Sequence, residues 1–284
     1  MKRAKKIPGG RVIVITGASS GIGKALAEQL SEQGDCVYAL ARSLPDHMKK
    51  EEQVNEGNGC LYTCPLDVTD PEAVQSVLKR ILTREYGRID ILIQSAGFGL
   101  AGPIEAMTPK EAKAQMAVNF LGSCYMLPPV LSAMRRQKSG LIVQLGSVAG
   151  FLPIPFQACY SASKAAVSAL MQALENEVKP YGIRCMLVQP GDTKTGFTSA
   201  RMISKMDSDM PYADRCRRSI ERMAADEQSG MTAEQMARLI VRRINKRRPP
   251  SVYTPGAFYK TIYFLQRLMP RRLIQAVLYR MYAA

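Results

Sequence analysis

Short apolar runs alternate with longer amphipathic stretches along most of this chain. Residues 11–16 form a continuous β-branched run, which is typical of a strand buried on both faces of a parallel sheet. Similar runs predict further strands at 36–41, 60–66, 89–94, 141–145 and 183–189, with an edge strand at 251–254. Strands that alternate with helical stretches predict a single α/β domain over residues 1–284. We expect a Rossmann-type, doubly wound parallel sheet of about seven strands with helices on both faces.

The amphipathic stretches carry helix signals. They predict helices over 24–33, 70–86, 109–136, 160–178, 214–225 and 232–243. Asp70 before Pro71 is typical of an N-cap and a first helical residue, and Thr232 with Gln235 is typical of a capping box. The Pro-Pro pair at 128–129 is expected to bend or interrupt the third helix, because proline removes a helical hydrogen bond.

The alternation loosens after Gly191. Residues 193–212 carry methionines among polar residues and predict a mobile segment, and we expect 192–228 to form a lid over a substrate. In the last stretch, 256–284, apolar residues recur at helical spacing with arginines between them. This amphipathic extension has two interpretations. It packs over a substrate cleft, which we favour, or it lies on an anionic membrane surface.

The net charge is strongly basic and unevenly placed. The chain carries a formal charge of +15, and residues 235–284 contain eleven Lys or Arg and no Asp or Glu. No nucleic-acid motif accompanies this charge, so binding of nucleic acid is not expected. The apolar run after the basic first ten residues is too short for a signal peptide, and no run of 18 apolar residues occurs. We therefore expect a cytoplasmic protein, with peripheral membrane contact through the C-terminal extension as the open alternative.

Cysteine and histidine usage narrows the chemistry. Seven cysteines without metal-ligand spacing favour free thiols in a reducing compartment and argue against a metal site. His47 is the single histidine, and no G-x-S-x-G elbow is present, so we exclude a Ser-His-Asp hydrolase. Acid and base catalysis therefore falls to another residue type.

A glycine-rich turn follows the first predicted strand. The residues Gly17-Ala18-Ser19-Ser20-Gly21-Ile22-Gly23 stand between that strand and a helical stretch, the context that distinguishes a dinucleotide motif from a chance match. Glycines let the backbone approach a pyrophosphate, which rests on the free N–H groups at the helix start. The turn therefore predicts a dinucleotide site.

Arg42 follows the second predicted strand, where a protein that binds NAD places an acidic residue on the ribose 2′-hydroxyl. A basic residue at this place can pair with the 2′-phosphate of NADP. The sequence therefore favours NADP(H) over NAD(H).

Tyr160 and Lys164 lie four residues apart on a predicted helix, which brings the ammonium beside the phenol. A phenol has an ordinary pKa of about 10, and a nearby cation favours the phenolate. Tyr160 is therefore a candidate general acid and base.

In combination these motifs resemble the short-chain dehydrogenase/reductase family, most nearly its hydroxysteroid and retinol dehydrogenase branch. The likeness covers about residues 10–200 and rests on the glycine-rich turn, on Tyr160-Ser-Ala-Ser-Lys164 and on single residues at family positions: Asp67, Asn119, Ser147, Pro190, Gly191 and Thr195. One departure is Gln94-Ser95-Ala96-Gly97, where the family has Asn-Asn-Ala-Gly, which affects the fine geometry of the cofactor wall more than the chemistry.

The resemblance implies a role for each catalytic candidate. Tyr160 exchanges a proton with the substrate oxygen as hydride moves to or from nicotinamide, and Ser147 hydrogen-bonds the same oxygen. Lys164 is expected to lower the pKa of Tyr160 and to hold the nicotinamide ribose, while Asn119 positions a water that relays protons to Lys164. The turn, Arg42 and the resemblance together imply this cofactor-binding set: Gly17, Ser19, Ser20, Gly21, Ile22, Gly23, Arg42, Asp67, Val68, Ala96, Gly97, Tyr160, Lys164, Pro190, Gly191, Thr193 and Thr195.

Apolar residues flank the expected reacting carbon, and the candidate substrate contacts are Phe98, Ser147, Phe151, Phe156 and Tyr160. Such walls favour a bulky hydrophobic substrate, a steroid, retinoid or lipid-like ketone, although core packing is the alternative explanation of the aromatic residues.

The sequence thus predicts an NADP(H)-dependent oxidoreductase that interconverts a ketone and a secondary alcohol on a hydrophobic small molecule. Two alternatives stay open. One is a reductase of 3-oxoacyl thioesters on acyl carrier protein, an acidic partner that suits the basic surface. The other is a non-catalytic dinucleotide sensor. The resemblance also implies a homo-oligomer, a dimer or tetramer.

Overall fold

The computed structural model describes residues 10–42, 53–54 and 59–284. The basic opening of the chain and His47, which entered the sequence argument, lie outside the described residues.

The described strands form one eight-stranded sheet in the order β12-β8-β7-β5-β1-β2-β4-β3. Seven strands run parallel, which confirms the predicted doubly wound sheet: β1 Val12–Thr16, β2 Cys36–Ala41, β4 Cys60–Pro65, β5 Ile91–Gln94, β7 Gly140–Leu145, β8 Ile183–Val188 and the edge strand β12 Val252–Tyr253. The eighth, β3 Gln53–Val54, pairs antiparallel with β4 and was not predicted, because two residues show no periodicity.

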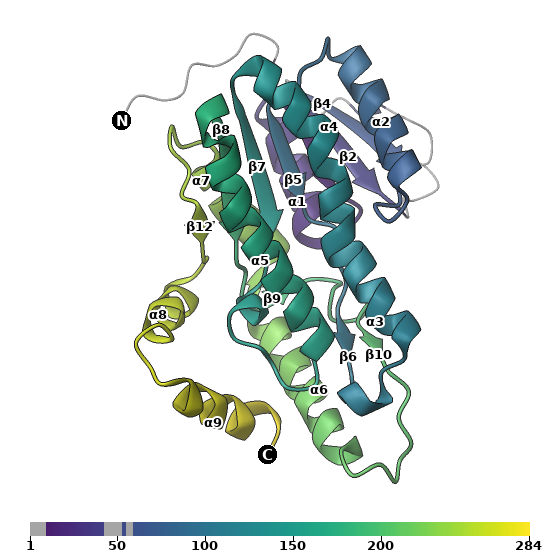
Figure 1. The fold of residues 1–284 in the computed structure, drawn as a ribbon, viewed down its shortest axis with the longest axis vertical. Coiled ribbons are helices and arrows are strands. Elements are labelled where there is room, and N and C mark those ends of the chain that lie inside the picture. The colour runs from purple at the N-terminus through teal and green to yellow at the C-terminus, as the bar shows by residue number, and fades with distance from the viewer. Residues whose placement is uncertain (1–9, 43–52, 55–58) are drawn as a thin grey trace.

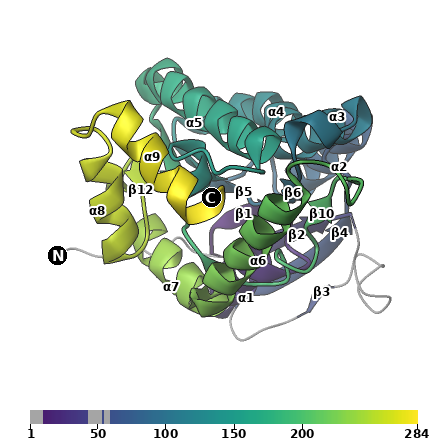
Figure 2. The same cartoon turned by 90° about the horizontal axis from the view of Figure 1, so that it is seen from below.

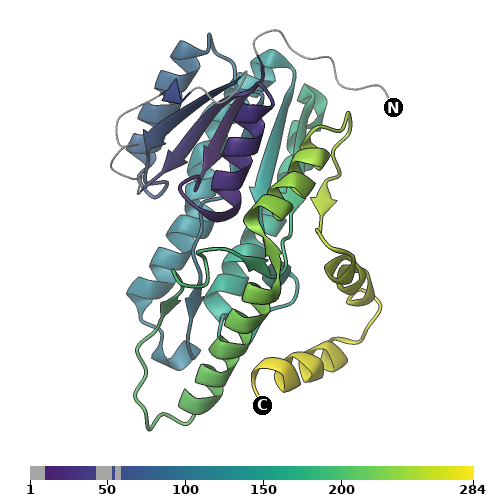
Figure 3. The same ribbon diagram turned by 180° about the vertical axis from the view of Figure 1, so that it is seen from behind.

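Helices cover both faces of the sheet. Figure 1 shows one face covered by α2 Pro71–Arg84, α4 Gly122–Gln137 and α5 Ala158–Val178. Figure 3 shows α1 Gly21–Glu32 and α7 Ala233–Ile244 on the other face. Each face buries its own apolar cluster against the β-branched strands, so residues 13 and 15 of β1 pack on one side and residues 12 and 14 on the other.

Two predicted helix starts are confirmed by their capping contacts. The Asp70 side chain accepts a hydrogen bond from the Ala73 N–H at 2.9 Å, with Pro71 as the first helical residue of α2. Thr232 and Gln235 form the capping box of α7. A second capping box, at Thr108 and Glu111, opens α3 Pro109–Met116. Each cap satisfies backbone N–H groups that the helix itself leaves unpaired.

The long helix expected over 109–136 departs from the prediction in one respect. The Pro-Pro pair at 128–129 lies inside α4 without ending it. The regular geometry is instead interrupted by a π-helical turn, Ala117–Leu121, between α3 and α4. The whole run Pro109–Gln137 is long and apolar enough to cross a membrane by length and composition alone. Here α4 packs against α2, and α3 and the π turn pack against α5.

The remaining elements lie beyond the carboxyl ends of the strands. The segment expected to be mobile, 193–212, contains two short strands, and the helix expected over 214–225 is longer. These elements are β6 Leu100–Ala101 paired with β10 Met202–Ile203, β9 Thr193–Lys194 paired with β11 Met231–Thr232, α6 Ala213–Ser229, α8 Ala257–Leu265 and α9 Arg271–Tyr282. Short 3₁₀ turns complete the chain at Ile104–Ala106, Val148–Gly150 and Lys179–Tyr181.

All seven cysteines lie within the described residues and are thiols, not disulfides; Cys64, Cys185 and Cys216 are buried. Within the described ranges, no three His, Cys, Asp or Glu side chains gather closely enough to hold a metal ion.

Candidate active site

A cavity of about 1100 Å³ opens at the carboxyl ends of the parallel strands. It lies where the chain order reverses between β1 and β5, the place at which open α/β sheets bind ligands. Sixteen of the seventeen predicted cofactor residues line it, and Gly23 is buried behind them. The sequence motifs are therefore brought together by the topology, although they come from five separate loops and from helix α5.

The glycine-rich turn has the backbone that only glycine adopts easily. Gly17 has φ +67°, and a Cβ there would lie 2.6 Å from the Ala96 nitrogen. A Cβ at Gly23 would lie 2.3 Å from the Gly17 oxygen, so helix α1 packs directly on the turn. Ser20, the N-cap residue, makes no side-chain capping hydrogen bond. The first N–H groups of α1 thus face the cavity ready for an anion, which fits a dinucleotide pyrophosphate.

Asp67 and Arg42 line the end of the cavity beyond β2 and β4. Burial alone would raise the pKa of Asp67, but hydrogen bonds from Thr69 and the charge of Arg42 lower it below its ordinary value. Asp67 is therefore ionised at neutral pH, and the exposed Arg42 guanidinium stands beside it. This arrangement fits an adenosine with a charged group near Arg42.

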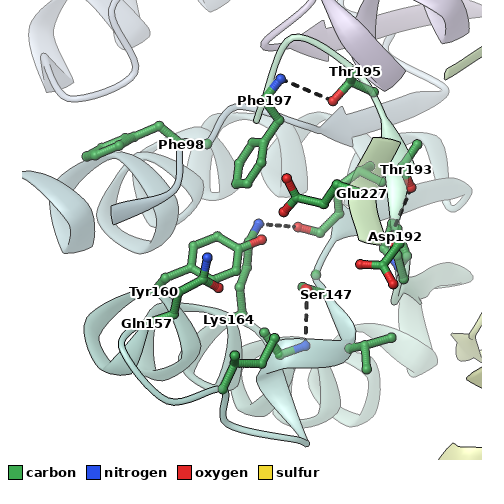
Figure 4. A pocket seen from close by; sticks show the side chains of 18 of the residues that line it. Phe98, Ser147, Gln157, Tyr160, Lys164, Asp192, Thr193, Thr195, Phe197 and Glu227 are labelled. Carbon is green, nitrogen blue, oxygen red and sulfur yellow. Dashed lines mark hydrogen bonds between the residues drawn. The ribbon is translucent and has the colours of Figure 1, made fainter. Parts of the chain in front are cut away.

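Tyr160 and Ser147 meet at the inner end of the cavity (Figure 4). Tyr160 lies in the first turn of α5, and Ser147 follows β7, where its Oγ accepts a hydrogen bond from the Ala149 N–H at 3.1 Å. Burial raises the pKa of Tyr160 to about 12, while a hydrogen bond with Ser147 lowers it and the nearby charge of Glu227 raises it. The phenol is therefore protonated at neutral pH and is poised to donate.

Lys164 is buried one helical turn from Tyr160, and its Nζ donates to the Leu145 carbonyl at 2.9 Å. Burial lowers its pKa to about 8. Its Nζ lies 5.8 Å from the centroid of the Tyr160 ring. The expected lowering of the Tyr160 pKa by Lys164 is not seen, because burial of the phenol dominates and the ammonium is turned toward a backbone carbonyl.

Asn119 lies in the π-helical turn and is fully buried. Its amide accepts from the Phe98 N–H and donates to the Phe98 carbonyl and to Ser163 Oγ, at 3.0, 3.1 and 3.0 Å. Ser163 in turn donates to the Tyr160 carbonyl. A Cβ at Gly97 would lie 3.2 Å from Asn119 Oδ1 and 3.6 Å from Lys164 Nζ, so these two side chains face one spot. Asn119 therefore ties the loop after β5 to helix α5 near Tyr160.

Of the three aromatic residues predicted to contact the substrate, one lines the cavity and two do not. Phe98 lines the cavity with Ser147 and Tyr160. Phe151 and Phe156 are not among the lining residues: Phe151 packs edge-on against Tyr263 of α8, with ring centroids 5.1 Å apart, and the Phe156 carbonyl accepts from the Gly102 N–H. Phe151 thus helps to seat the C-terminal extension.

Several lining residues were missed by the sequence argument. The Phe197 ring lies 5.7 Å from the Tyr160 ring, and Glu227 of α6 faces the same phenol across the cavity (Figure 4). Glu227 forms an ion pair with Arg201, whose side chain is almost fully buried, and accepts from Thr198 Oγ1 at 2.6 Å. Neither belongs to a short motif, so only the fold reveals them.

The C-terminal extension supplies much of the apolar wall. The lining side chains from it are Phe258, Tyr259, Ile262, Leu265, Gln266, Met269, Ile274, Val277, Leu278, Met281 and Tyr282. The Tyr259 ring lies only 2.2 Å from where a Cβ of Gly191 would stand, so α8 packs on the Pro190-Gly191 turn. In Figure 2, α9 lies across the end of the sheet at which the cavity opens.

This arrangement can protonate a carbonyl oxygen held by Ser147 and Tyr160 next to a dinucleotide-shaped crevice. The comparisons agree with that chemistry. Residues 11–205 match the family model described as short chain dehydrogenase. A 3-ketodihydrosphingosine reductase of Bacteroides thetaiotaomicron is 36% identical over 275 residues, covering 96% of this chain and 98% of that protein. Human 17-beta-hydroxysteroid dehydrogenase type 1 is 36% identical over 192 residues, covering 66% of this chain and 58% of that protein.

Solved structures show the same fold. A short-chain dehydrogenase from Streptomyces avermitilis superposes with a TM-score of 0.78 at 28% identity, over 95% of this chain and 96% of that one. A short chain dehydrogenase from Burkholderia cenocepacia in complex with NADP superposes with a TM-score of 0.71 at 24% identity, over 97% of this chain and 98% of that one.

Proposed function

Because this chain belongs to the short chain dehydrogenase family and is an NAD(P)-dependent oxidoreductase acting on alcohol and ketone groups, we propose that it reduces a long-chain, lipid-like ketone with NADPH. The observation that carries the proposal is the shape of the site. A protonated Tyr160 bonded by Ser147 stands at the inner end of a cavity whose far wall is the apolar lining of α8 and α9.

The protein's own groups divide the reaction between them. Ser147 and Tyr160 hold the substrate oxygen, and the Tyr160 phenol donates its proton to that oxygen as negative charge develops. A nicotinamide cofactor, when bound, supplies the hydride. Lys164, one helical turn from Tyr160 and lining the same cavity, would hold the nicotinamide ribose. Asn119 keeps this helix and the loop after β5 in register.

Arg42 supports a preference for NADPH. It is an exposed cation that lines the cavity beside the ionised Asp67 and stands just past β2. A ribose 2′-phosphate placed there gains a charge-assisted pairing, whereas a 2′-hydroxyl gains none. We expect Arg42→Ala to weaken NADPH binding at least tenfold and to leave NADH binding nearly unchanged, as measured by the KM of each cofactor.

The proposed substrate class is based on the apolar side chains with which α8 and α9 line the cavity. The match to the 3-ketodihydrosphingosine reductase spans 96% of this chain, so it takes in most of the C-terminal extension that lines the apolar end, whereas the match to the steroid dehydrogenase covers 66%. A flexible alkyl chain fits a methionine- and leucine-lined wall that closes at a polar end near Tyr160. We therefore place 3-ketodihydrosphingosine first among the candidate substrates.

The segment 192–228 contributes Phe197, Arg222 and Asp226 to the lining, all from outside the sheet. We propose that it acts as the lid over the substrate, as expected from the sequence. We also propose that the enzyme is cytoplasmic, where NADPH is available.

The test is oxidation of NADPH and of NADH with a ketone panel. The panel holds 3-ketodihydrosphingosine, a steroid ketone, a retinal, a 3-oxoacyl thioester and a water-soluble aliphatic ketone. We expect fastest turnover of the long-chain ketone with NADPH and a loss of at least 100-fold in kcat with Tyr160→Phe. Cofactor binding without turnover of any member would contradict the proposal and favour a dinucleotide sensor. Preferred turnover of the thioester would favour the acyl carrier protein reductase.

A further inference from the structure

The outer faces of α8, of α9 and of the turn between them leave large apolar side chains in solvent. Phe264 is 55% exposed, Leu268 83%, Leu273 50% and Tyr279 53%. None of the four lines the cavity. Together with the cations beside them, Lys260, Arg267, Arg271, Arg272 and Arg280, we call them the docking surface. Scattered single apolar residues are common on proteins, but a cluster on two consecutive helices marks a contact with something apolar.

The docking surface continues into the mouth of the cavity. Phe258, Leu265, Val277 and Met281 each line the cavity and are each at least 45% exposed, and Met202 of β10 does the same from the opposite side. The inner wall, the rim and the outer surface therefore form one uninterrupted apolar path. A substrate with a long alkyl chain could follow it without crossing water.

The charge on the docking surface is of one sign. The extension contains no Asp or Glu, and within the described part of the chain none of its five cations forms a salt bridge. Arg271 and Arg272 occupy the first turn of α9, where no acidic residue and no side-chain cap offsets the helix dipole. Two cations at this end are unfavourable in isolation and become favourable once an anion binds.

Contacts on the inner face of α9 fix the position of the docking surface. Leu278 is buried, and Tyr282 donates to Asp226 of α6 at 3.2 Å. Arg215 and Arg218, also of α6, donate to the carbonyl groups of the last two residues. These contacts fix the inner face of α9 on α6 (Figure 2), so the apolar outer face stays exposed in the folded chain.

From these observations we infer that α8 and α9 dock on an anionic lipid bilayer, with the cavity mouth turned toward the membrane. Apolar side chains with arginines beside them that form no described salt bridge are the composition of helices that lie in a membrane interface. This inference rests on the proposed function for its biological sense, since a lipid-like ketone would then pass from the bilayer into the cavity. The binding itself stands on the surface alone.

The full chain is tested by co-sedimentation with vesicles of phosphatidylcholine alone and of phosphatidylcholine mixed equally with phosphatidylglycerol. We expect binding to the mixed vesicles that weakens as salt is raised. The pair Arg271→Gln with Arg272→Gln should weaken it roughly 30-fold. The triple variant Phe264→Ser, Leu268→Ser and Leu273→Ser should abolish it. Matched controls lie at the opposite end of the sheet, near the amino ends of the strands: Arg135→Gln with Arg136→Gln, and Tyr86→Ser with Tyr181→Ser. Both should bind as the unsubstituted protein does.

The inference is overturned if the chain stays in the supernatant with mixed vesicles, or if the surface variants and the controls bind alike. It is also overturned if the triple variant changes the oligomeric state in size-exclusion chromatography without any vesicle binding, because a second copy then covers the surface. Reduction of the water-soluble ketone by NADPH is measured in parallel. Vesicle binding without reduction of this ketone or of any other ketone in the panel would refute the proposed function and leave the docking surface standing.

Discussion

Replacing Lys164 with methionine should make the protein more stable at neutral pH while removing its activity. The Lys164 side chain is buried, and burial lowers its pKa from an ordinary 10.5 to about 8. That fall corresponds to about 3 kcal/mol of unfavourable free energy for holding the ammonium inside the fold. Losing the hydrogen bond to the Leu145 carbonyl costs about 1 kcal/mol. Methionine fills a similar volume, so the net gain in unfolding free energy is about 2 kcal/mol.

The gain has a definite pH dependence. Below pH 8 the lysine is charged in both the folded and the unfolded chain, so the full cost of burial is present. Between pH 8 and 10.5 the unfolded chain binds a proton that the folded chain has released, so the contribution of Lys164 to stability rises with pH. Above that window the ammonium is gone from both states, and only the lost hydrogen bond separates the variant from the unsubstituted protein.

Urea unfolding at pH 7 and pH 10 measures this difference. The Lys164→Met midpoint should exceed that of the unsubstituted protein at pH 7, and the excess should shrink at pH 10. Other tyrosines and cysteines titrate in the same range, but they are common to both proteins and cancel in the comparison. Lys113→Met, on the exposed face of α3, is the control and should change neither midpoint by more than about 0.5 kcal/mol. A variant less stable at pH 7, or equally shifted at both pH values, would refute the reasoning.

Two further substitutions test the site geometry. Glu227→Gln leaves the buried Arg201 guanidinium without its carboxylate, so the unfolding free energy should fall by about 3 kcal/mol in urea titrations. Because the charge of Glu227 raises the pKa of Tyr160, the same variant should move the alkaline limb of the kcat profile to lower pH, and an unmoved limb would contradict the assignment. Gly97→Ala places a methyl group 3.2 Å from Asn119 Oδ1, so kcat should fall several-fold with little change in urea midpoint. An unchanged kcat would show that the spot between Asn119 and Lys164 is not used.

Local sequence was sufficient to predict those parts of the candidate site whose residues lie close together in the chain. The strand, glycine turn and helix around Gly17 predict a phosphate cradle because each part is a short-range signal. The same holds for Tyr160 and Lys164, whose spacing on one helix fixes their proximity. The order of strands then brings these motifs to one edge of the sheet, as the alternation of strands and helices predicts.

The other features of the candidate site depend on packing between residues far apart in the chain, which short sequence patterns do not predict. Glu227 is one acidic residue in a polar helix, and nothing near it in the chain indicates that α6 turns it toward Tyr160. Phe151 was predicted to contact the substrate from its position in the sequence. In the fold, α8 packs beside it, and its ring contacts Tyr263 instead. The pKa of Tyr160 likewise follows from burial, a property of the whole fold rather than of the Lys164 spacing.

The π-helical turn at 117–121 carries a consequence for how this helix can vary. Each residue of a helix rotates the chain by about 100°, so removing one residue from the turn would twist α3 and α4 against each other by more than a quarter turn. Either Asn119 would swing away from Ser163 or Met126 and Val130 of α4 would leave the core. The π-helical turn therefore sets the rotation of Asn119, which faces the candidate site, relative to the α4 residues that pack in the core. A one-residue deletion in the turn is expected to be far more damaging than most substitutions.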